Sequence, residues 1–165
     1  MNQLRTQHTG VYSGLVVAGL FLFFAALGPG LYGHTGAGDF GWQHALFDSV
    51  CHQDPDRSFY LNGTLMAVCA RCIGIYTCFM IGVLIIPVVD YFVPQSKTVM
   101  VKVLVAVVLS NFIDVAGNFF GVWTNTLNSR FLLGSLLGLS AALILTNTFF
   151  FNTKIGVTKW TMNTW

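Results

Sequence analysis

IGIYTCFMIGVLIIPVVDYFV, residues 73–93, is the stretch of sequence that decides the fold class. It contains 21 residues, and Asp90 is the only one that carries a charge. A helix of about 20 apolar residues is long enough to cross the ~30 Å hydrocarbon layer of a membrane. The ten-residue alternating segments of a membrane β-barrel do not occur in the chain. We therefore expect a transmembrane helix, in which every backbone polar group is satisfied internally.

The composition of the whole chain supports the same class. Of its 165 residues, 55% are hydrophobic and 8% are charged, whereas a soluble domain has about 25% charged residues. The alternative is an unusually apolar soluble protein, which the low charged fraction disfavours. The basic residues are too scattered to form a nucleic-acid surface, so no nucleic-acid partner is expected. We predict a single transmembrane domain over residues 1–165.

Four apolar segments are close to the length needed to span a membrane. The predicted fold is therefore an all-α integral membrane protein with about four transmembrane helices, at residues 11–31, 66–93, 99–122 and 131–151. The first segment could instead be a cleaved signal peptide. Its apolar run is longer than the 7–15 residues of a signal core, and it is not followed by a clear small-x-small cleavage site. Both features argue against a signal peptide.

The distribution of Lys and Arg predicts the orientation, because cytoplasmic loops are enriched in these residues. In a four-helix arrangement, five basic residues fall on one side: Arg5, Lys97, Lys102, Lys154 and Lys159. Arg57 and Arg130 fall on the other, and Arg71 lies near a helix end. We therefore expect both termini in the cytoplasm and the connection 32–65 outside. Six of its residues recur at nearly helical spacing and predict a short interfacial helix: Phe40, Trp42, His44, Phe47, Val50 and Cys51.

Three of the four cysteines lie close together in this part of the sequence. Cys51 and His52 precede the motif Cys69-Ala70-Arg71-Cys72 by eighteen residues. Cys51, His52, Cys69 and Cys72 make a Cys₃His set, which suits zinc or another thiophilic transition metal. Adjacent residues rarely bind one metal, so His52 is either the fourth ligand or a group that supports the ligands. The alternatives are thiol chemistry, a structural disulfide, and packing of the cysteines as small apolar side chains.

The C-x-x-C motif also supports a second interpretation. A C-x-x-C at the outer end of a helix in a four-helix membrane protein resembles the quinone-coupled enzymes that generate disulfides. An outward-facing compartment is oxidising, and Arg71 would stabilise a thiolate. The resemblance implies a quinone as electron acceptor. However, those enzymes use a second cysteine pair, and only Cys51 is available for that role here.

Polar residues within the third apolar segment indicate a second part of the site. Asp114 would be a costly intramembrane carboxylate, and Asn111 and Asn118 share its helix face at i, i+3 and i+7. Asp114 could handle a proton or a cation while Arg71 helps to hold an anionic group of a lipid-borne or small substrate. The residues expected to line this polar pocket are Asn111, Asn118, Arg57, Arg130 and Tyr76. The alternative is that Asp114 pairs with Arg71 or Arg130 and only ties helices together.

These motifs resemble a family of small prokaryotic integral membrane proteins classified only as a domain of unknown function. Its signature appears as Cys51-His52-Gln53, then Arg57-Ser58-Phe59, then Cys69-Ala70-Arg71-Cys72 followed by Gly74-Ile75-Tyr76. An Asp within a helix and an Asn-x-Arg turn followed by glycines complete it, as Asp114, Asn128, Arg130, Gly134 and Gly138. Ile73 stands where the family often has Thr. The resemblance implies the helical fold and the cytoplasmic membrane of a prokaryote, and it implies no reaction.

The sequence therefore predicts a multi-pass membrane protein with a Cys/His metal site at the outer interface, next to a polar intramembrane pocket. Two alternatives stay open: a quinone-coupled thiol–disulfide oxidoreductase, and an accessory subunit of a larger membrane complex. Membrane lipid is the expected partner in each case. The sequence does not decide whether the protein is an enzyme. Gly134 and Gly138 form a G-x-x-x-G motif, which is typical of close helix packing.

Overall fold

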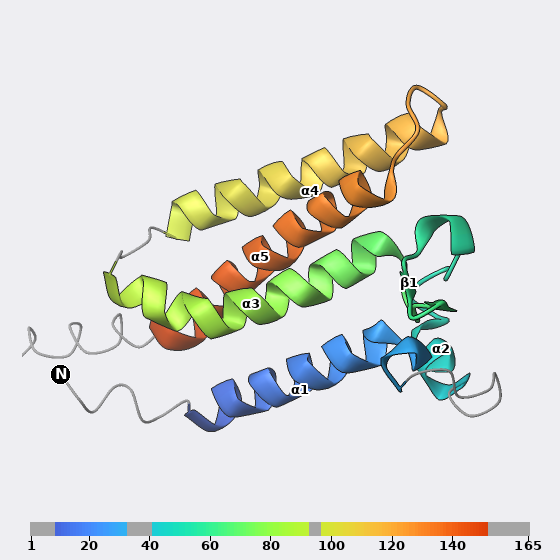
Figure 1. Ribbon diagram of the computed structural model, residues 1–165. Coiled ribbons are helices and arrows are strands. Elements are labelled where there is room, and N and C mark those ends of the chain that lie inside the picture. The colour runs from blue at the N-terminus through green and yellow to red at the C-terminus, as the bar shows by residue number, and fades with distance from the viewer. Residues whose placement is uncertain (1–8, 33–40, 93–96, 152–165) are drawn as a thin grey trace, which may run out of the picture.

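The structure, a computed structural model, describes residues 9–32, 41–92 and 97–151, which are mostly helical (Figure 1). Four long helices lie side by side, with α3 between α1 and α5, and α4 beside α5. The basic residues Arg5, Lys154 and Lys159 lie outside the described residues, as does Phe40. The elements in chain order are α1 (Thr9–Leu27), η1 (Pro29–Tyr32), α2 (Gly41–Phe47), η2 (Pro55–Arg57), β1 (Tyr60–Leu61), β2 (Thr64–Leu65), α3 (Ala70–Phe92), α4 (Lys97–Phe119) and α5 (Leu127–Phe151).

The predicted helical class is confirmed. Among the described residues, two segments are long and apolar enough to cross a membrane, Thr98–Phe119 and Leu127–Leu145. The other two long helices contain shorter apolar stretches, Tyr12–Leu27 and Ala70–Ile85. Four membrane crossings, their orientation and a single domain therefore stay predictions.

In the structure, one end of each of the first two helices differs by four residues from the approximate bound expected from the sequence. α1 ends at Leu27 instead of residue 31, because Gly28 adopts a positive φ of 76° that stops the helix. α3 begins at Ala70 instead of residue 66: a hairpin of β1 and β2 ends at Leu65, and the Met66 N–H continues its hydrogen bonding by donating to the Phe59 carbonyl at 3.0 Å. Asn62 and Gly63 form its turn, with φ values of 51° and 78°, as a type I′ turn requires.

The ends of the last two helices also differ from the prediction. α4 ends at Phe119 instead of residue 122, where Gly121 has a φ of 70° and the Val122 N–H reaches back 2.9 Å to the Gly117 carbonyl. α5 begins at Leu127 instead of residue 131. Thr126 caps it, because its Oγ1 accepts a 3.2 Å hydrogen bond from the backbone N–H of Ser129.

The α3–α5 pair is in direct backbone contact. A Cβ atom on Gly134 would collide with the Arg71 carbonyl oxygen, and one on Gly138 would collide with that of Ile75. From the facing helix, a Cβ on Gly74 would collide with the Phe131 carbonyl oxygen. The G-x-x-x-G motif therefore packs α5 against α3, as the sequence predicted. No side chain separates the two helices at these points, so their register is closely constrained.

Replacing Gly134 by Leu should disrupt this contact. The added side chain has no space beside the Arg71 backbone, so we expect a loss of about 1–3 kcal/mol in the free energy of unfolding. The measurement is thermal or denaturant unfolding of the detergent-purified protein. Gly14→Leu on α1 is the matched control, because a Cβ at Gly14 would meet nothing within 4 Å. Equal stability of the two variants would contradict the proposed packing.

A second contact ties α1 to α3. Pro87 has no N–H, so the Val83 carbonyl four residues earlier lacks its usual helical donor. The Tyr12 hydroxyl of α1 supplies the missing hydrogen bond at 3.0 Å. Val83 is fully buried, so this carbonyl could not turn to water instead. The proline thus creates an acceptor on α3 that helps to fix α1 beside it.

The Tyr12→Phe substitution should cost about 1 kcal/mol of unfolding free energy, because it leaves the Val83 carbonyl without its donor. In a Pro87→Ala background the helix supplies its own N–H, and the same substitution should cost much less. The four proteins of this double-mutant cycle are compared by denaturant unfolding in detergent. A Tyr12→Phe cost that is the same in both backgrounds would exclude this account of the bond.

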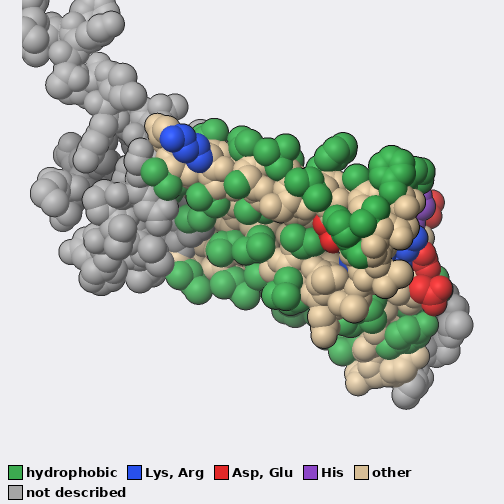
Figure 2. Space-filling model, turned by 90° about the horizontal axis from the view of Figure 1, so that it is seen from above, with side chains coloured by type: hydrophobic (Ala, Val, Ile, Leu, Met, Phe, Trp, Pro, Cys, Tyr) green, Lys and Arg blue, Asp and Glu red, His purple; other side chains and the backbone are tan. Residues whose placement is uncertain are grey.

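The connection between α1 and α3 and the 120–126 turn between α4 and α5 lie at the same end of the helices (Figure 1). A buried cluster fills this end under the connection: Ala25, Ala26, Phe47, Cys51, Ala67, Val68 and Ile73. Figure 2 shows hydrophobic side chains along the length of the helices, and most of the charged side chains at this end. The face of α4 is especially apolar and exposed, for example at Phe112 and Ile113.

Candidate functional site

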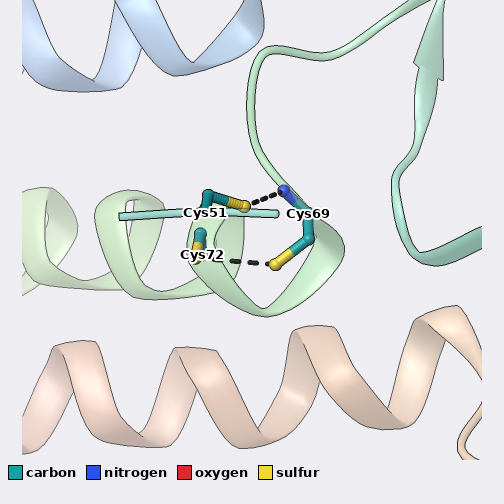
Figure 3. A group of neighbouring side chains, drawn as sticks. All are labelled: Cys51, Cys69 and Cys72. Carbon is teal, nitrogen blue, oxygen red and sulfur yellow. Dashed lines mark hydrogen bonds between the residues drawn. The ribbon is translucent and has the colours of Figure 1, made fainter. Parts of the chain in front are cut away.

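Three cysteines form a compact thiol cluster under the α1–α3 connection (Figure 3). The sulfur atoms of Cys51, Cys69 and Cys72 all lie within 4.8 Å of one another. The Cys69 and Cys72 sulfurs are 3.5 Å apart, and the Cys51 sulfur accepts a 3.2 Å hydrogen bond from the backbone N–H of Cys69. Cys51 is buried and the other two are half-buried. The structure thus brings together three of the four residues predicted as metal ligands.

Local structure explains how each sulfur reaches the cluster. Cys51 follows α2 directly, and its N–H donates to the Phe47 carbonyl at 2.8 Å. Gln53 holds this turn, because its amide donates to the His44 carbonyl at 2.6 Å and its Oε1 lies 3.1 Å from the His44 ring nitrogen. Cys69 stands at the start of α3, where its carbonyl accepts the first helical hydrogen bond. Cys72 follows on the same helix face, three residues later.

The remaining Cys and His residues of interest lie outside the thiol cluster. The His52 side chain is exposed, although its neighbour Cys51 is buried. His52 is not part of the group of side chains whose ligand atoms lie within 4.8 Å of one another. Cys78 lies on α3 and is not part of the group of three sulfurs.

The cluster favours ionisation at one of its sulfurs. Hydrogen bonding with the Cys51 and Cys72 side chains lowers the pKa of the Cys69 thiol below its ordinary value. The backbone N–H groups of Cys72 and Arg71 act in the same direction, whereas burial opposes them. Cys69 at the start of α3 is therefore the sulfur most easily converted to a thiolate, the form that binds metals and attacks disulfides.

Arg71 points away from the thiols, towards α4. It forms an ion pair with Asp114, and the Asn125 side chain donates a 2.6 Å hydrogen bond to the same carboxylate oxygen. The Arg71 Nε is buried without a hydrogen-bond partner among the described residues. The pair therefore joins α3, α4 and the 120–126 turn, in agreement with the interpretation of Asp114 as a tie between helices.

Asn111 and Asn118 share the inward face of α4 with Asp114, as their spacing predicts. The Asn111 amide donates to the Leu133 carbonyl of α5 at 3.2 Å. Asn118 Oδ1 accepts a 3.2 Å hydrogen bond from the backbone N–H of Asn125. Both bonds are therefore to backbone, and they hold α4 to α5 and to the turn.

The other predicted pocket residues divide between two places. Tyr76 lies beside the thiol cluster, where its ring packs against Phe47 with the centroids 5.7 Å apart. Arg130 lies in the first turn of α5, within electrostatic range of Arg57 and Arg71. Arg57 itself forms an exposed ion pair with Asp54 at 3.0 Å. The site thus has a thiol part and an arginine part, with the Cys69–Cys72 motif contributing to both.

The Arg71–Asp114 pair offers a direct test of the structural role of Asp114. The Asp114→Asn variant keeps the shape but leaves the Arg71 charge uncompensated, so we expect it to lose about 2 kcal/mol of unfolding free energy. Adding Arg71→Met removes that charge and should recover part of the loss, measured by denaturant unfolding. Asp54→Asn, in the exposed pair with Arg57, is the control and should cost less than 1 kcal/mol. Additive losses in the double variant would show that the two side chains are not coupled.

Comparison with known proteins places the chain in a family. The model of a family described as "Predicted membrane protein (DUF2085)" matches residues 51–144, which include the thiol cluster, Asp114 and Arg130. This chain belongs to the DUF2085 family. It is 32% identical to an uncharacterised protein of Methanocaldococcus jannaschii over 111 residues, covering 65% of this chain and 68% of that protein. The family predicted from the cysteine motifs is therefore confirmed.

A second archaeal relative is more distant. An uncharacterised protein of Methanothermobacter thermautotrophicus is 28% identical over 99 residues, which cover 59% of this chain and 86% of that protein. No solved structure was found to match the chain. The DUF2085 description agrees with the apolar helices found here, and it names no reaction.

Sequence reasoning did not foresee several contacts that build the site. Gln53 and His44 shape the turn that buries Cys51, and Asn125 is the second partner of Asp114. No local sequence pattern predicts these contacts. The hairpin could have been predicted, because Asn-Gly is a strong signal for a type I′ turn. Asn62 also ties this hairpin to η1, through a 2.9 Å hydrogen bond from its amide to the Gly30 carbonyl.

Proposed function

We propose that this DUF2085 protein is a membrane protein that binds a thiophilic metal, most simply zinc, through Cys51, Cys69 and Cys72. The observation that carries the proposal is the convergence of three sulfurs from two distant segments within 4.8 Å. A zinc ion with Zn–S bonds of about 2.3 Å separates tetrahedral sulfur ligands by roughly 3.8 Å. The spacing of the cluster is therefore close to what such an ion needs.

The surroundings of the cluster also suit a metal. Two sulfurs come from successive turns at the start of α3, a rigid element, and the third from the turn after α2. The hydrogen bond from the Cys69 N–H to the Cys51 sulfur stabilises negative charge on that ligand. Half-buried Cys69 and Cys72 leave a path by which an ion can enter.

Three sulfurs leave a fourth coordination position, for which His52 is the predicted candidate. Its side chain is exposed and lies outside the group of three sulfurs. We therefore assign His52 a supporting role and leave the fourth position to water or to a substrate. A metal with an open position can activate a bound water or polarise a substrate, which is the chemistry that this site would supply.

The membrane arrangement that we propose has four crossings, formed by α1, α3, α4 and α5. With 19 residues, α1 is about 28 Å long, close to the thickness of the hydrocarbon layer. The thiol cluster then lies at one membrane surface, because the α1–α3 connection and the α4–α5 turn meet at one end (Figure 1). The distribution of basic residues favours the outer face of the cytoplasmic membrane for this end.

A thiol–disulfide oxidoreductase is the second candidate, and one observation favours it. The Cys69 and Cys72 sulfurs are already 3.5 Å apart, with Cys69 at the start of a helix. In this reaction the two thiols form one S–S bond and release two protons and two electrons. A quinone accepts both and becomes a hydroquinone. Cys51 is not required for that step, whereas a three-sulfur metal site requires it.

The Cys51→Ser variant therefore separates the two functions. For the metal site, we expect about one metal ion per chain in the unchelated wild-type protein and a loss of most of it in Cys51→Ser and in Cys69→Ser/Cys72→Ser. Elemental analysis of detergent-purified protein provides the measurement. Cys78→Ser is the matched control and should keep the metal, because Cys78 lies outside the cluster. The His52→Ala variant should keep it as well.

A wild-type protein without metal would contradict the metal site. In that case the oxidoreductase predicts an oxidised Cys69–Cys72 pair that persists in Cys51→Ser. Alkylation of free thiols followed by mass spectrometry detects this pair as two protected cysteines, and the pair should disappear on reduction.

A further inference from the structure

The fold brings three arginines from three different segments to one place. The Arg71 backbone packs against Gly134, one helical turn after Arg130 on α5. The ring of Phe59, two residues after Arg57, meets the ring of Phe131, which follows Arg130, with the centroids 6.1 Å apart. The loop carrying Arg57 and the start of α3 therefore both lie against the first turn of α5, where Arg130 is located.

The charges in this arginine cluster are incompletely compensated within the protein. Arg71 pairs with Asp114, and Arg57 pairs with Asp54 at the exposed surface. Within residues 9–32, 41–92 and 97–151, no hydrogen bond or ion pair joins the Arg130 side chain to a partner. Partial burial disfavours the Arg130 charge, Arg57 and Arg71 repel it, and the Cys69 sulfur and the already paired Asp114 attract it more weakly.

The position of Arg130 on its helix is also unfavourable for a cation. The first turn of an α-helix carries a partial positive charge, which stabilises anions and repels cations. Arg130 lies in that turn of α5, within electrostatic range of two other arginines. An anion bound between the arginines would remove these repulsions and would also reach the positive end of the helix.

We propose that Arg57, Arg71 and Arg130 form a binding site for a phosphate group. Guanidinium groups bind oxyanions through paired, charge-assisted hydrogen bonds. Three guanidiniums offer more donors than the two oxygens of a carboxylate can accept, whereas a terminal phosphate presents three oxygens. The buried Arg71 Nε, which has no partner among the described residues, is one donor free to contribute. This site goes beyond the metal centre and does not depend on a metal.

The phosphate could belong to a lipid headgroup or to a dissolved molecule. Arg57 lies in η2, and Arg71 and Arg130 lie in the first turns of α3 and α5, at the end of the helices that carries the connecting segments (Figure 1). A headgroup and a solute could each approach this end. Both sources present the same chemical group, so the test includes one probe for each.

The test measures binding of two probes to the full-length protein. Inorganic phosphate is titrated into the detergent-purified protein, and binding is followed by thermal stabilisation at constant ionic strength. Phosphatidic acid is compared with phosphatidylcholine by native mass spectrometry. We expect wild type to bind at least one phosphate probe, and Arg130→Gln to weaken that binding by about tenfold or more, the loss of one charge-assisted contact. The Arg130→Lys variant, which keeps the charge, should bind with intermediate affinity.

The Lys102→Gln variant is the matched control, because it makes the same change in net charge at an exposed position near the other end of α4. It should bind the probe as wild type does. Binding of phosphate alone would assign the site to a solute, and binding of phosphatidic acid alone to a lipid headgroup. Absence of binding to either probe, or equal weakening by Lys102→Gln and Arg130→Gln, would overturn the proposal. Unfolding curves without probe show whether each variant is folded.

Discussion

The rest of the structure depends on the contact between the α3 and α5 backbones. Gly134 and Gly138 lie against the carbonyl groups of Arg71 and Ile75, and Gly74 lies against that of Phe131. Because no side chain separates the helices at these points, a shift along either axis would bring Cβ atoms of neighbouring residues into backbone atoms. The contact therefore fixes the start of α3, with its two cysteines and Arg71, relative to the first turn of α5.

This constraint explains how a four-residue motif can serve two sites. Cys69 and Cys72 are three residues apart and share one face of the helix start, where they meet Cys51. Arg71 projects in another direction and reaches Asp114 on α4. The two thiols and Arg71 thus share one short segment but contact different partners.

The connections between helices hold the sulfur and arginine groups in place through hydrogen bonds. Gln53 closes the turn that buries Cys51, and Asn125 braces the carboxylate that pairs with Arg71. The tie between Tyr12 and Val83 follows the same principle, because a backbone group without its helical partner is satisfied by a neighbouring element. Polar groups in this protein therefore specify how apolar helices, which could otherwise slide past each other, are arranged.

The sequence by itself determined the helical class and the family, and it singled out the three cysteines that the structure brings together. Hydrophobic length, the cysteine spacing and the G-x-x-x-G motif are local patterns, and local patterns suffice for these conclusions. Only the tertiary structure separated His52 from the three sulfurs, paired Arg71 with Asp114 and brought Arg130 within electrostatic range of two arginines. These outcomes depend on which way side chains point after distant segments pack. The backbone contact between α3 and α5 fixes Arg71 relative to the first turn of α5, and the hydrogen-bonded turn after α2 places His52. No single short segment contains both partners of either contact.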